Sequence, residues 1–68
     1  MIKLGVIGVG TIACAVVKGL KAKYGDGLAV FLSPRNAGKA GALARDYNGV
    51  TVMGSNQEAA DAADWLLF

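Results

Sequence analysis

The chain has 68 residues, of which 54% are hydrophobic and 18% are charged, and its formal net charge is +2. This length limits it to one small domain, and the apolar composition excludes a disordered chain. One cysteine and no histidine exclude an internal disulfide and a Cys/His zinc site, the small charge does not favour nucleic-acid binding, and no apolar run approaches the ~20 residues of a membrane span.

The first strand and helix are predicted from a change of hydrophobic period near residue 10. Residues 2–8, IKLGVIG, are typical of a strand buried on both faces. From Thr11 to about Lys23 the period is helical, and the apolar face consists of Ala13, Val16, Val17, Leu20 and Tyr24. The lysines of this helix are expected to point elsewhere: Lys18, Lys21 and Lys23. Gly25 is a natural end for the helix.

The second strand and helix follow the same pattern. Residues 28–33, LAVFLS, form a second apolar run, and Pro34 forces a turn after it. Asn36 is a good helix cap, and the helix it begins is expected to run to about Tyr47. The apolar face of that helix consists of Ala40, Leu43, Ala44 and Tyr47.

Two strands and one short helix complete the pattern. Residues 49–53 are typical of a short strand, the Ser55-x-x-Glu58 capping box opens an alanine-rich helix, and residues 65–68 begin a fourth strand. Apolar strands that alternate with helices predict a parallel sheet with right-handed crossovers and helices on both faces. The predicted fold class is therefore α/β, a Rossmann-type three-layer sandwich truncated after the fourth strand.

A glycine motif lies between the first strand and the first helix. The segment fits G-x-G-x-x-G/A and consists of Gly8, Val9, Gly10, Thr11, Ile12 and Ala13. Gly8 allows a sharp turn, Gly10 allows the backbone to approach a pyrophosphate, and Ala13 keeps helix and strand close. The helix N-terminus then offers free N–H groups to the phosphates. The motif predicts dinucleotide binding, and the alternative is a tight turn without a ligand.

The end of the second strand indicates which dinucleotide is bound. An NAD site usually has Asp or Glu there, but this chain has Ser33, Pro34 and Arg35. A hydroxyl, an arginine and nearby N–H groups suit a 2′-phosphate, which a carboxylate would repel. Lys39 lies one turn into the helix and adds charge. We therefore predict NADP(H) as the cofactor, the alternative being that Arg35 and Lys39 are solvated surface charges.

Three segments together resemble the amino-terminal part of pyrroline-5-carboxylate reductase, the NAD(P)H-dependent last enzyme of proline synthesis. They are GVIGVGTIACAVVKGL, SPRN and SNQEAADAADWLLF. The family's first turn falls on Gly8, Gly10, Ile12, Ala13 and Ala15, with Ile12 where methionine is common. Its phosphate-recognising segment falls on Ser33, Pro34 and Arg35, and its asparagine on the adenosine side of the cofactor falls on Asn56.

The resemblance spans essentially all 68 residues and implies NADPH-dependent reduction of 1-pyrroline-5-carboxylate, a small-molecule substrate, to L-proline. It implies that residues 1–68 are an incomplete dinucleotide-binding domain. An A-V-K-P segment and a helical carboxy-terminal domain would follow, and that domain would form a homodimer or higher homo-oligomer. No catalytic residue can be named within these residues, and no metal, nucleic-acid or membrane partner is expected. No leader pattern is evident, so we expect a cytoplasmic protein.

Two further classes of function also fit these residues. The same glycine turn occurs in other reductases of the 6-phosphogluconate-dehydrogenase-like group, which act on imines, β-hydroxyacids or deazaflavins. A Rossmann module that senses nucleotides without catalysis is the second class. The remaining chemically notable side chains are interpreted as structural: Cys14 and Tyr24 as helix packing, Trp65 as core or a domain contact, and Asp61 and Asp64 as solvated charges.

Overall fold

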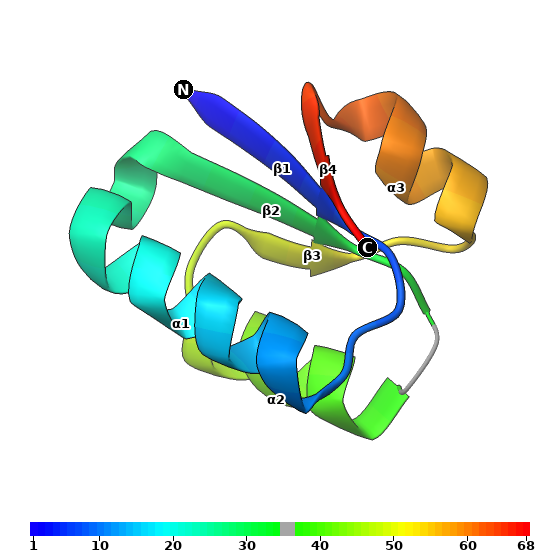
Figure 1. Cartoon of the computed structure of the whole chain (residues 1–68), viewed down its shortest axis with the longest axis horizontal. Coiled ribbons are helices and arrows are strands. Elements are labelled where there is room, and N and C mark those ends of the chain that lie inside the picture. Colours follow the sequence, from blue (N-terminus) through cyan, green and yellow to red (C-terminus); the bar gives the residue numbers. More distant parts are fainter. Residues whose placement is uncertain (35–36) are drawn as a thin grey trace.

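The computed structural model describes residues 1–34 and 37–68 and confirms the predicted alternation of strands and helices (Figure 1). A short 3-10 turn, Gly25–Gly27, follows the first helix. The elements in chain order are β1 (Ile2–Val6), α1 (Thr11–Tyr24), β2 (Leu28–Leu32), α2 (Ala37–Asp46), β3 (Val50–Val52), α3 (Asn56–Ala62) and β4 (Trp65–Leu67). The helix cap predicted at Asn36 lies outside the described residues.

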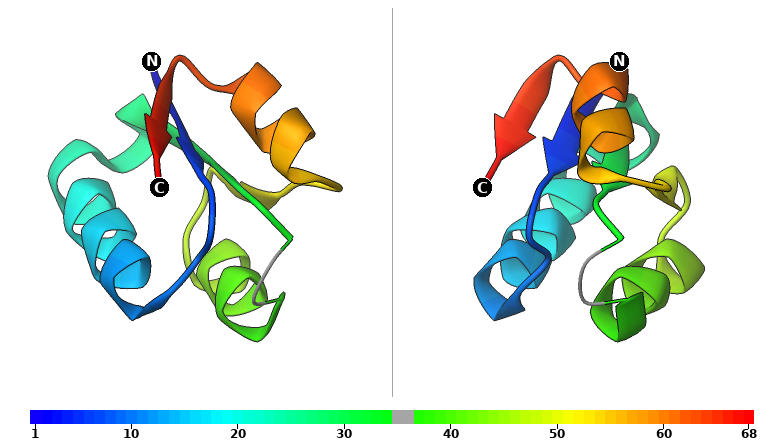
Figure 2. Two further views of the ribbon diagram at one scale, coloured as in Figure 1. Left: turned by 45° about the vertical axis from the view of Figure 1, so that its right-hand side comes forward. Right: turned by 90° about the vertical axis from the view of Figure 1, so that its right-hand side faces the viewer.

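The four strands form one parallel sheet in the order β3-β2-β1-β4. Strand β1 is central, and its Leu4 is in register with Val30 of β2 on one side and Trp65 of β4 on the other. Helices α1 and α2 cover one face of the sheet, and α3 covers the other (Figures 1 and 2). The fold is therefore the predicted Rossmann-like α/β sandwich of three layers.

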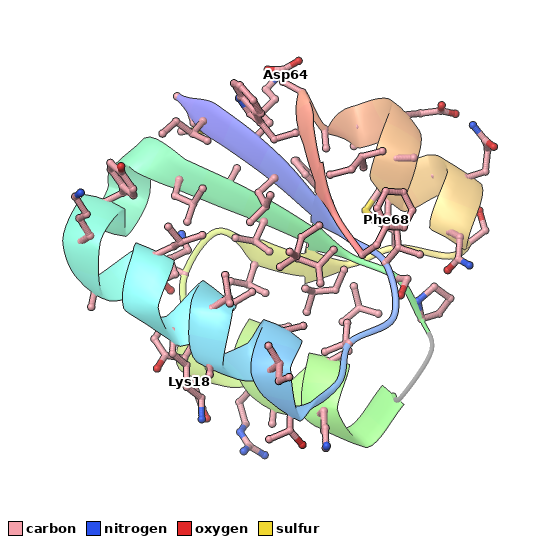
Figure 3. The ribbon with its side chains drawn as sticks, in the orientation of Figure 1. Lys18, Asp64 and Phe68 are labelled. Carbon is pink, nitrogen blue, oxygen red and sulfur yellow. The ribbon has the colours of Figure 1, made fainter. Side chains whose placement is uncertain are left out.

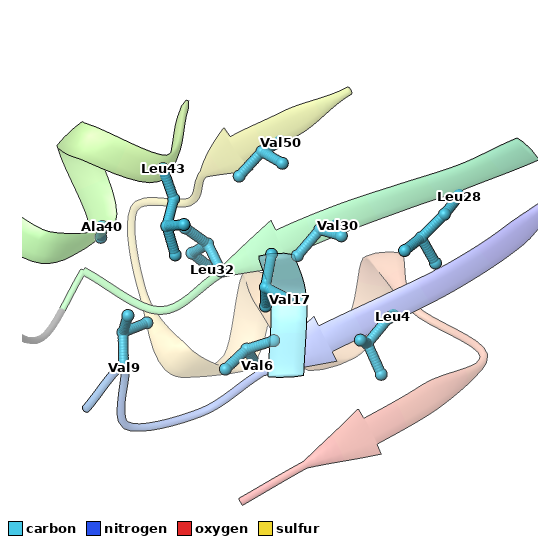
Figure 4. Packing of buried hydrophobic residues seen from close by; sticks show 10 residues of the cluster. All are labelled: Leu4, Val6, Val9, Val17, Leu28, Val30, Leu32, Ala40, Leu43 and Val50. Carbon is cyan, nitrogen blue, oxygen red and sulfur yellow. The ribbon is translucent and has the colours of Figure 1, made fainter. Parts of the chain in front are cut away.

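The core lies between the sheet and the α1–α2 layer, where apolar side chains fill the space (Figures 3 and 4). Its buried members are Leu4, Val6, Val9, Val17, Leu28, Val30, Leu32, Ala40, Leu43 and Val50. The predicted face of α2 is confirmed, because Ala40 and Leu43 are buried and Ala44 and Tyr47 pack against the core. The face of α1 is confirmed only in part, since Val16 and Tyr24 are exposed.

The prediction that Lys21 points away from the core is wrong. Its side chain is only 7% exposed, and it lies one helical turn after the buried Val17. The ammonium donates to the carbonyl of Gly25 at 3.2 Å and to that of Leu28. The methylenes of a lysine can pack against apolar surface while the charged end finds acceptors, so a lysine fits this face when carbonyls lie at its tip.

One half of the capping box predicted at the start of α3 is confirmed, namely the hydrogen bond to the Ser55 hydroxyl. In the other half, the Glu58 carboxylate bonds to the N–H one residue before the expected one. The Ser55 hydroxyl accepts from the Glu58 N–H at 3.1 Å. The Glu58 carboxylate accepts from the N–H of Gly54 at 2.9 Å, one residue before the cap. Both bonds satisfy backbone donors that the helix itself leaves unpaired. The box therefore determines where α3, with Asn56 at its first position, begins.

An apolar groove of about 470 Å³ lies beside α1 at the open β4 edge of the sheet. It is lined by Ile2, Leu4, Val16, Leu20, Tyr24, Leu28, Trp65, Leu66 and Leu67. Trp65 is 66% exposed, so it is not a core residue of these 68 residues. Within the part of the chain that the structure describes, strand β4 is hydrogen-bonded to β1 alone, and this leaves its side chains less covered than those of β1.

Replacing Lys21 by methionine tests whether the buried ammonium stabilises the fold. Methionine keeps the apolar stem but leaves the two carbonyls without this donor, which should lower the free energy of unfolding by about 1–3 kcal/mol. Urea denaturation followed by circular dichroism measures the loss. Lys18→Met, on the exposed side of the same helix, is the control and should change stability by less than about 0.5 kcal/mol. Equal effects of the two substitutions would contradict the assignment.

Replacing Gly5 by alanine tests the close contact between β1 and α3. A Cβ at Gly5 would lie 2.9 Å from the Ala59 carbonyl oxygen and 3.0 Å from the Ala63 Cβ. Overpacking against backbone should destabilise the protein by about 1–3 kcal/mol. The same substitution at Gly19, in α1 with open space around it, should instead stabilise by up to about 1 kcal/mol. Thermal melts of both variants measure these changes in stability. An unchanged melting temperature of Gly5→Ala would refute the close contact.

Candidate cofactor site

The candidate site lies at the carboxyl end of β1, where the direction of winding reverses. The chain passes from β1 to β2 and β3 on one side, and β4 then returns to the other side of β1. Parallel sheets bind ligands at such a switch point, outside the carboxyl ends of the strands. The glycine turn of the structure consists of residues 7–10, which include the predicted Gly8 and Gly10, and it leads from β1 into α1 at this point (Figure 1).

The two glycines of the turn leave an open surface for a ligand. Gly8 has φ of +76°, a left-handed conformation that glycine adopts without strain, and Gly10 is extended. A Cβ at either glycine would meet no atom within 4 Å, so the space above the backbone is clear. Val9 between them is buried in the core and anchors the turn. The turn thus exposes its backbone and not the Val9 side chain.

The N-terminus of α1 is suited to an anion. The capping residue is Gly10, which carries no side chain, and no acidic residue lies in the first helical turn. The N–H groups at this end therefore keep their partial positive charge for a ligand. Ile12, in the same turn, is 82% exposed, and Ala13 is half-buried against the core. The predicted contacts on this helix, Thr11 to Ala13, thus lie together with the capping glycine.

Ser33 connects β2 to the glycine turn. Its side chain is 0% exposed, and its hydroxyl oxygen accepts from the N–H of Gly8 at 3.0 Å. The Ser33 N–H donates to the Val6 carbonyl at 2.9 Å. This arrangement differs from the direct phosphate contact expected from the sequence, which needs an exposed hydroxyl. The following Pro34 is exposed, and Arg35 lies outside the described residues.

Lys39 of α2 reaches the first residue of α1. Its ammonium donates to the Thr11 hydroxyl at 2.9 Å, and both side chains are exposed. The contact joins the N-terminal ends of the two helices that cover this face of the sheet. Thr11 and Lys39 also border a groove of about 240 Å³ between α1 and α2, together with Cys14, Lys18, Ala42, Leu43 and Asp46. The sequence pattern could not reveal this pair, because 28 residues separate its members.

Two hollows meet at the end of β4. One, of about 300 Å³, is lined by Gly8, Gly10, Ile12, Ala13, Leu67 and Phe68. The other has a volume of about 290 Å³, and the exposed Asn56 is one of its lining residues. The remaining lining residues are Ile7, Gln57, Ala60, Leu66 and Phe68. Phe68 borders both hollows and lies beside the turn that follows β1 (Figure 3). Sequence reasoning missed Phe68 as a site residue, because it assigns residues 65–68 to the fourth strand, whereas in the structure β4 ends at Leu67.

Three of the side chains interpreted as structural in the sequence have surroundings that fit this role. Asp61 accepts from the Gln57 amide at 2.8 Å on the surface of α3, and Asp64 lies at the opposite end of β4 from Phe68 (Figure 3). Cys14 is half-buried and packs against the core.

Among the residues that the structure describes, no helix is both long enough and apolar enough to cross a membrane.

Comparison with known proteins gives a family match. Residues 3–68 match the model of a protein family described as "NADP oxidoreductase coenzyme F420-dependent". No curated protein and no solved structure matches the chain. The matched range includes the glycine turn, Ser33, Lys39 and Asn56, and it covers almost the whole chain. The chain therefore belongs to this family of NADP oxidoreductases and is an oxidoreductase domain of the nicotinamide-nucleotide class.

Proposed function

We propose that this chain binds NADP(H), with the pyrophosphate at the glycine turn and the 2′-phosphate beside Lys39. The observation that carries the proposal is the 2.9 Å hydrogen bond from Lys39 to Thr11, which places an ammonium at the start of α1. Ser33 directly follows strand β2, at the place where an NAD site typically has a carboxylate. A cation and helix N-termini without a neighbouring acid favour a dinucleotide with an additional phosphate.

The position of Lys39 is electrostatically unfavourable without an anion. A lysine near a helix N-terminus faces the positive end of the helix dipole, and Lys39 lies close to this end of both α1 and α2. Within residues 1–34 and 37–68, it forms no ion pair with a carboxylate, and Asp46 on the same groove does not reach it. A phosphate at this place would neutralise the ammonium and both helix ends at once.

The glycine turn fits the rest of the dinucleotide. The clear space over Gly8 and Gly10 allows a pyrophosphate to approach the backbone, and the uncapped end of α1 supplies donors. The exposed side chains of Ile12 and Phe68 form an apolar border to the adjoining hollow, which suits the flat nicotinamide ring. Pro34 and Arg35 remain predicted contacts of the 2′-phosphate, and Asn56 remains a predicted contact on the adenosine side.

For the reaction, we propose NADPH-dependent reduction of 1-pyrroline-5-carboxylate to L-proline by the protein that contains this domain. Support comes from the resemblance of its three segments and from membership of an NADP oxidoreductase family. When bound, the cofactor supplies a hydride to the C=N carbon, and the ring nitrogen of the substrate takes up a proton. The residues of this chain orient the nicotinamide and keep water from it. We assign the substrate contacts, and the formation of a homodimer or higher homo-oligomer, to the helical domain that the resemblance implies.

A second candidate reaction is hydride exchange between NADP(H) and a deazaflavin. The description of the matched family names coenzyme F420, and this makes a deazaflavin the second candidate among the substrates of the wider reductase group. Both reactions use the same cofactor site, so the proposal for NADP(H) does not depend on the choice between them.

Replacing Lys39 by alanine tests the 2′-phosphate site. Loss of a charge-assisted hydrogen bond should raise the dissociation constant for NADPH about tenfold or more and leave that for NADH within about twofold. Isothermal titration calorimetry measures both constants. Lys18→Ala, a lysine on the same groove that lies further along α1, is the control and should leave both unchanged. Equal weakening of NADPH and NADH by Lys39→Ala would refute the assignment.

The reaction is tested by turnover with the full-length natural protein. We expect NADPH oxidation to be stimulated by 1-pyrroline-5-carboxylate, with proline as the product detected by chromatography. Transfer of hydride to oxidised F420 instead would support the second candidate. Tight NADPH binding without turnover of either substrate would contradict both reactions and favour a nucleotide-sensing module.

A further inference from the structure

We propose that Ser33 is a positioning residue that sets the backbone of the phosphate-binding turn and does not itself contact the 2′-phosphate. The inference rests on the proposed function, because it concerns how this chain holds a dinucleotide. It changes the role expected from the sequence, in which Ser33 recognises the 2′-phosphate directly. The two residues would then have different roles. Ser33 would affect binding of the pyrophosphate through the shape of the turn, and Lys39 would contact the 2′-phosphate.

The burial of Ser33 excludes a direct contact in this conformation. Its side chain is 0% exposed, and the hydroxyl oxygen is directed to the Gly8 N–H at 3.0 Å. Its own N–H donates to Val6, so Ser33 holds the chain both before and within the turn. Gly8 in contrast is exposed, with open space above it. A ligand at this surface would therefore contact Gly8, whereas Ser33 would support the Gly8 backbone from the buried side.

The hydrogen bond determines the direction in which the Gly8 N–H points. A glycine with positive φ has other conformations available at little cost, so the turn needs an external restraint to keep one shape. An N–H that points into the protein is costly without an acceptor, and the Ser33 oxygen supplies one. With this N–H fixed inward, the peptide groups that follow are presented to the pyrophosphate in one arrangement.

The chemistry of serine suits this place better than that of an acid. A carboxylate can also accept a hydrogen bond from a glycine N–H, but it would put a negative charge directly below the phosphates. A hydroxyl gives the same restraint without charge and can be fully buried. Ser33 therefore lets the turn keep its shape while the potential above it stays positive from α1 and Lys39.

The experiment compares Ser33→Ala with Lys39→Ala on two fragments of the cofactor. ADP-ribose carries the pyrophosphate and lacks the 2′-phosphate, whereas adenosine 2′-monophosphate has the reverse. Ser33→Ala should weaken ADP-ribose about three- to tenfold, the range expected for one neutral hydrogen bond, and leave adenosine 2′-monophosphate unchanged. Lys39→Ala should do the opposite. NMR titration of each variant measures both affinities, including weak ones.

A second measurement separates positioning from general stability. Hydrogen exchange of the Gly8 amide should become faster in Ser33→Ala, while exchange of buried amides in β1 and β2 stays the same. Weakening of adenosine 2′-monophosphate alone by Ser33→Ala, unchanged binding of both fragments, or an unchanged Gly8 amide would each overturn the inference. Failure of the unsubstituted protein to bind either fragment would reject the proposed function itself, and the role of Ser33 with it.

Discussion

Strand β1 is buried over residues 4–6, and the site depends on how its neighbours confine this part of the strand. It is hydrogen-bonded to β2 and β4, and a side chain at Gly5 would collide with the backbone of α3. The strand therefore has to be short, apolar and small on one face, and the chain leaves the sheet only where the neighbouring strands also end. This places the glycine turn at the switch point, next to Ser33 on one side and Leu67 on the other.

Among the described residues, the positive potential of the site comes from two sources. The turn and the uncapped start of α1 contribute backbone donors, and Lys39 contributes the nearby ammonium. The neutral oxygen of Ser33 accepts the hydrogen bond from the Gly8 N–H and adds no opposing charge. Because the hydrogen bond of this cation to the Thr11 hydroxyl is exposed, the ammonium can exchange that partner for a phosphate.

The sequence predicts what periodicity and local motifs determine, namely the order of elements, the parallel sheet and the glycine turn. It does not predict features that depend on the end of a side chain or on distant segments. The charge of Lys21 predicts an exposed side chain, but its stem lies on the apolar face and two carbonyls accept from its tip. The inward direction of Ser33 and the pairing of Lys39 with Thr11 require the relative placement of β1, β2 and two helices.

In the proposed function, the carboxyl edge of the sheet binds the phosphates of NADP(H). Titration of the isotope-labelled protein with NADP⁺, followed by amide chemical shifts, tests it most directly. We expect the largest shifts at Gly8, Gly10, Thr11 and Lys39, and no shifts in the apolar groove beside Trp65. Shifts confined to that groove, or none at millimolar nucleotide, would contradict it.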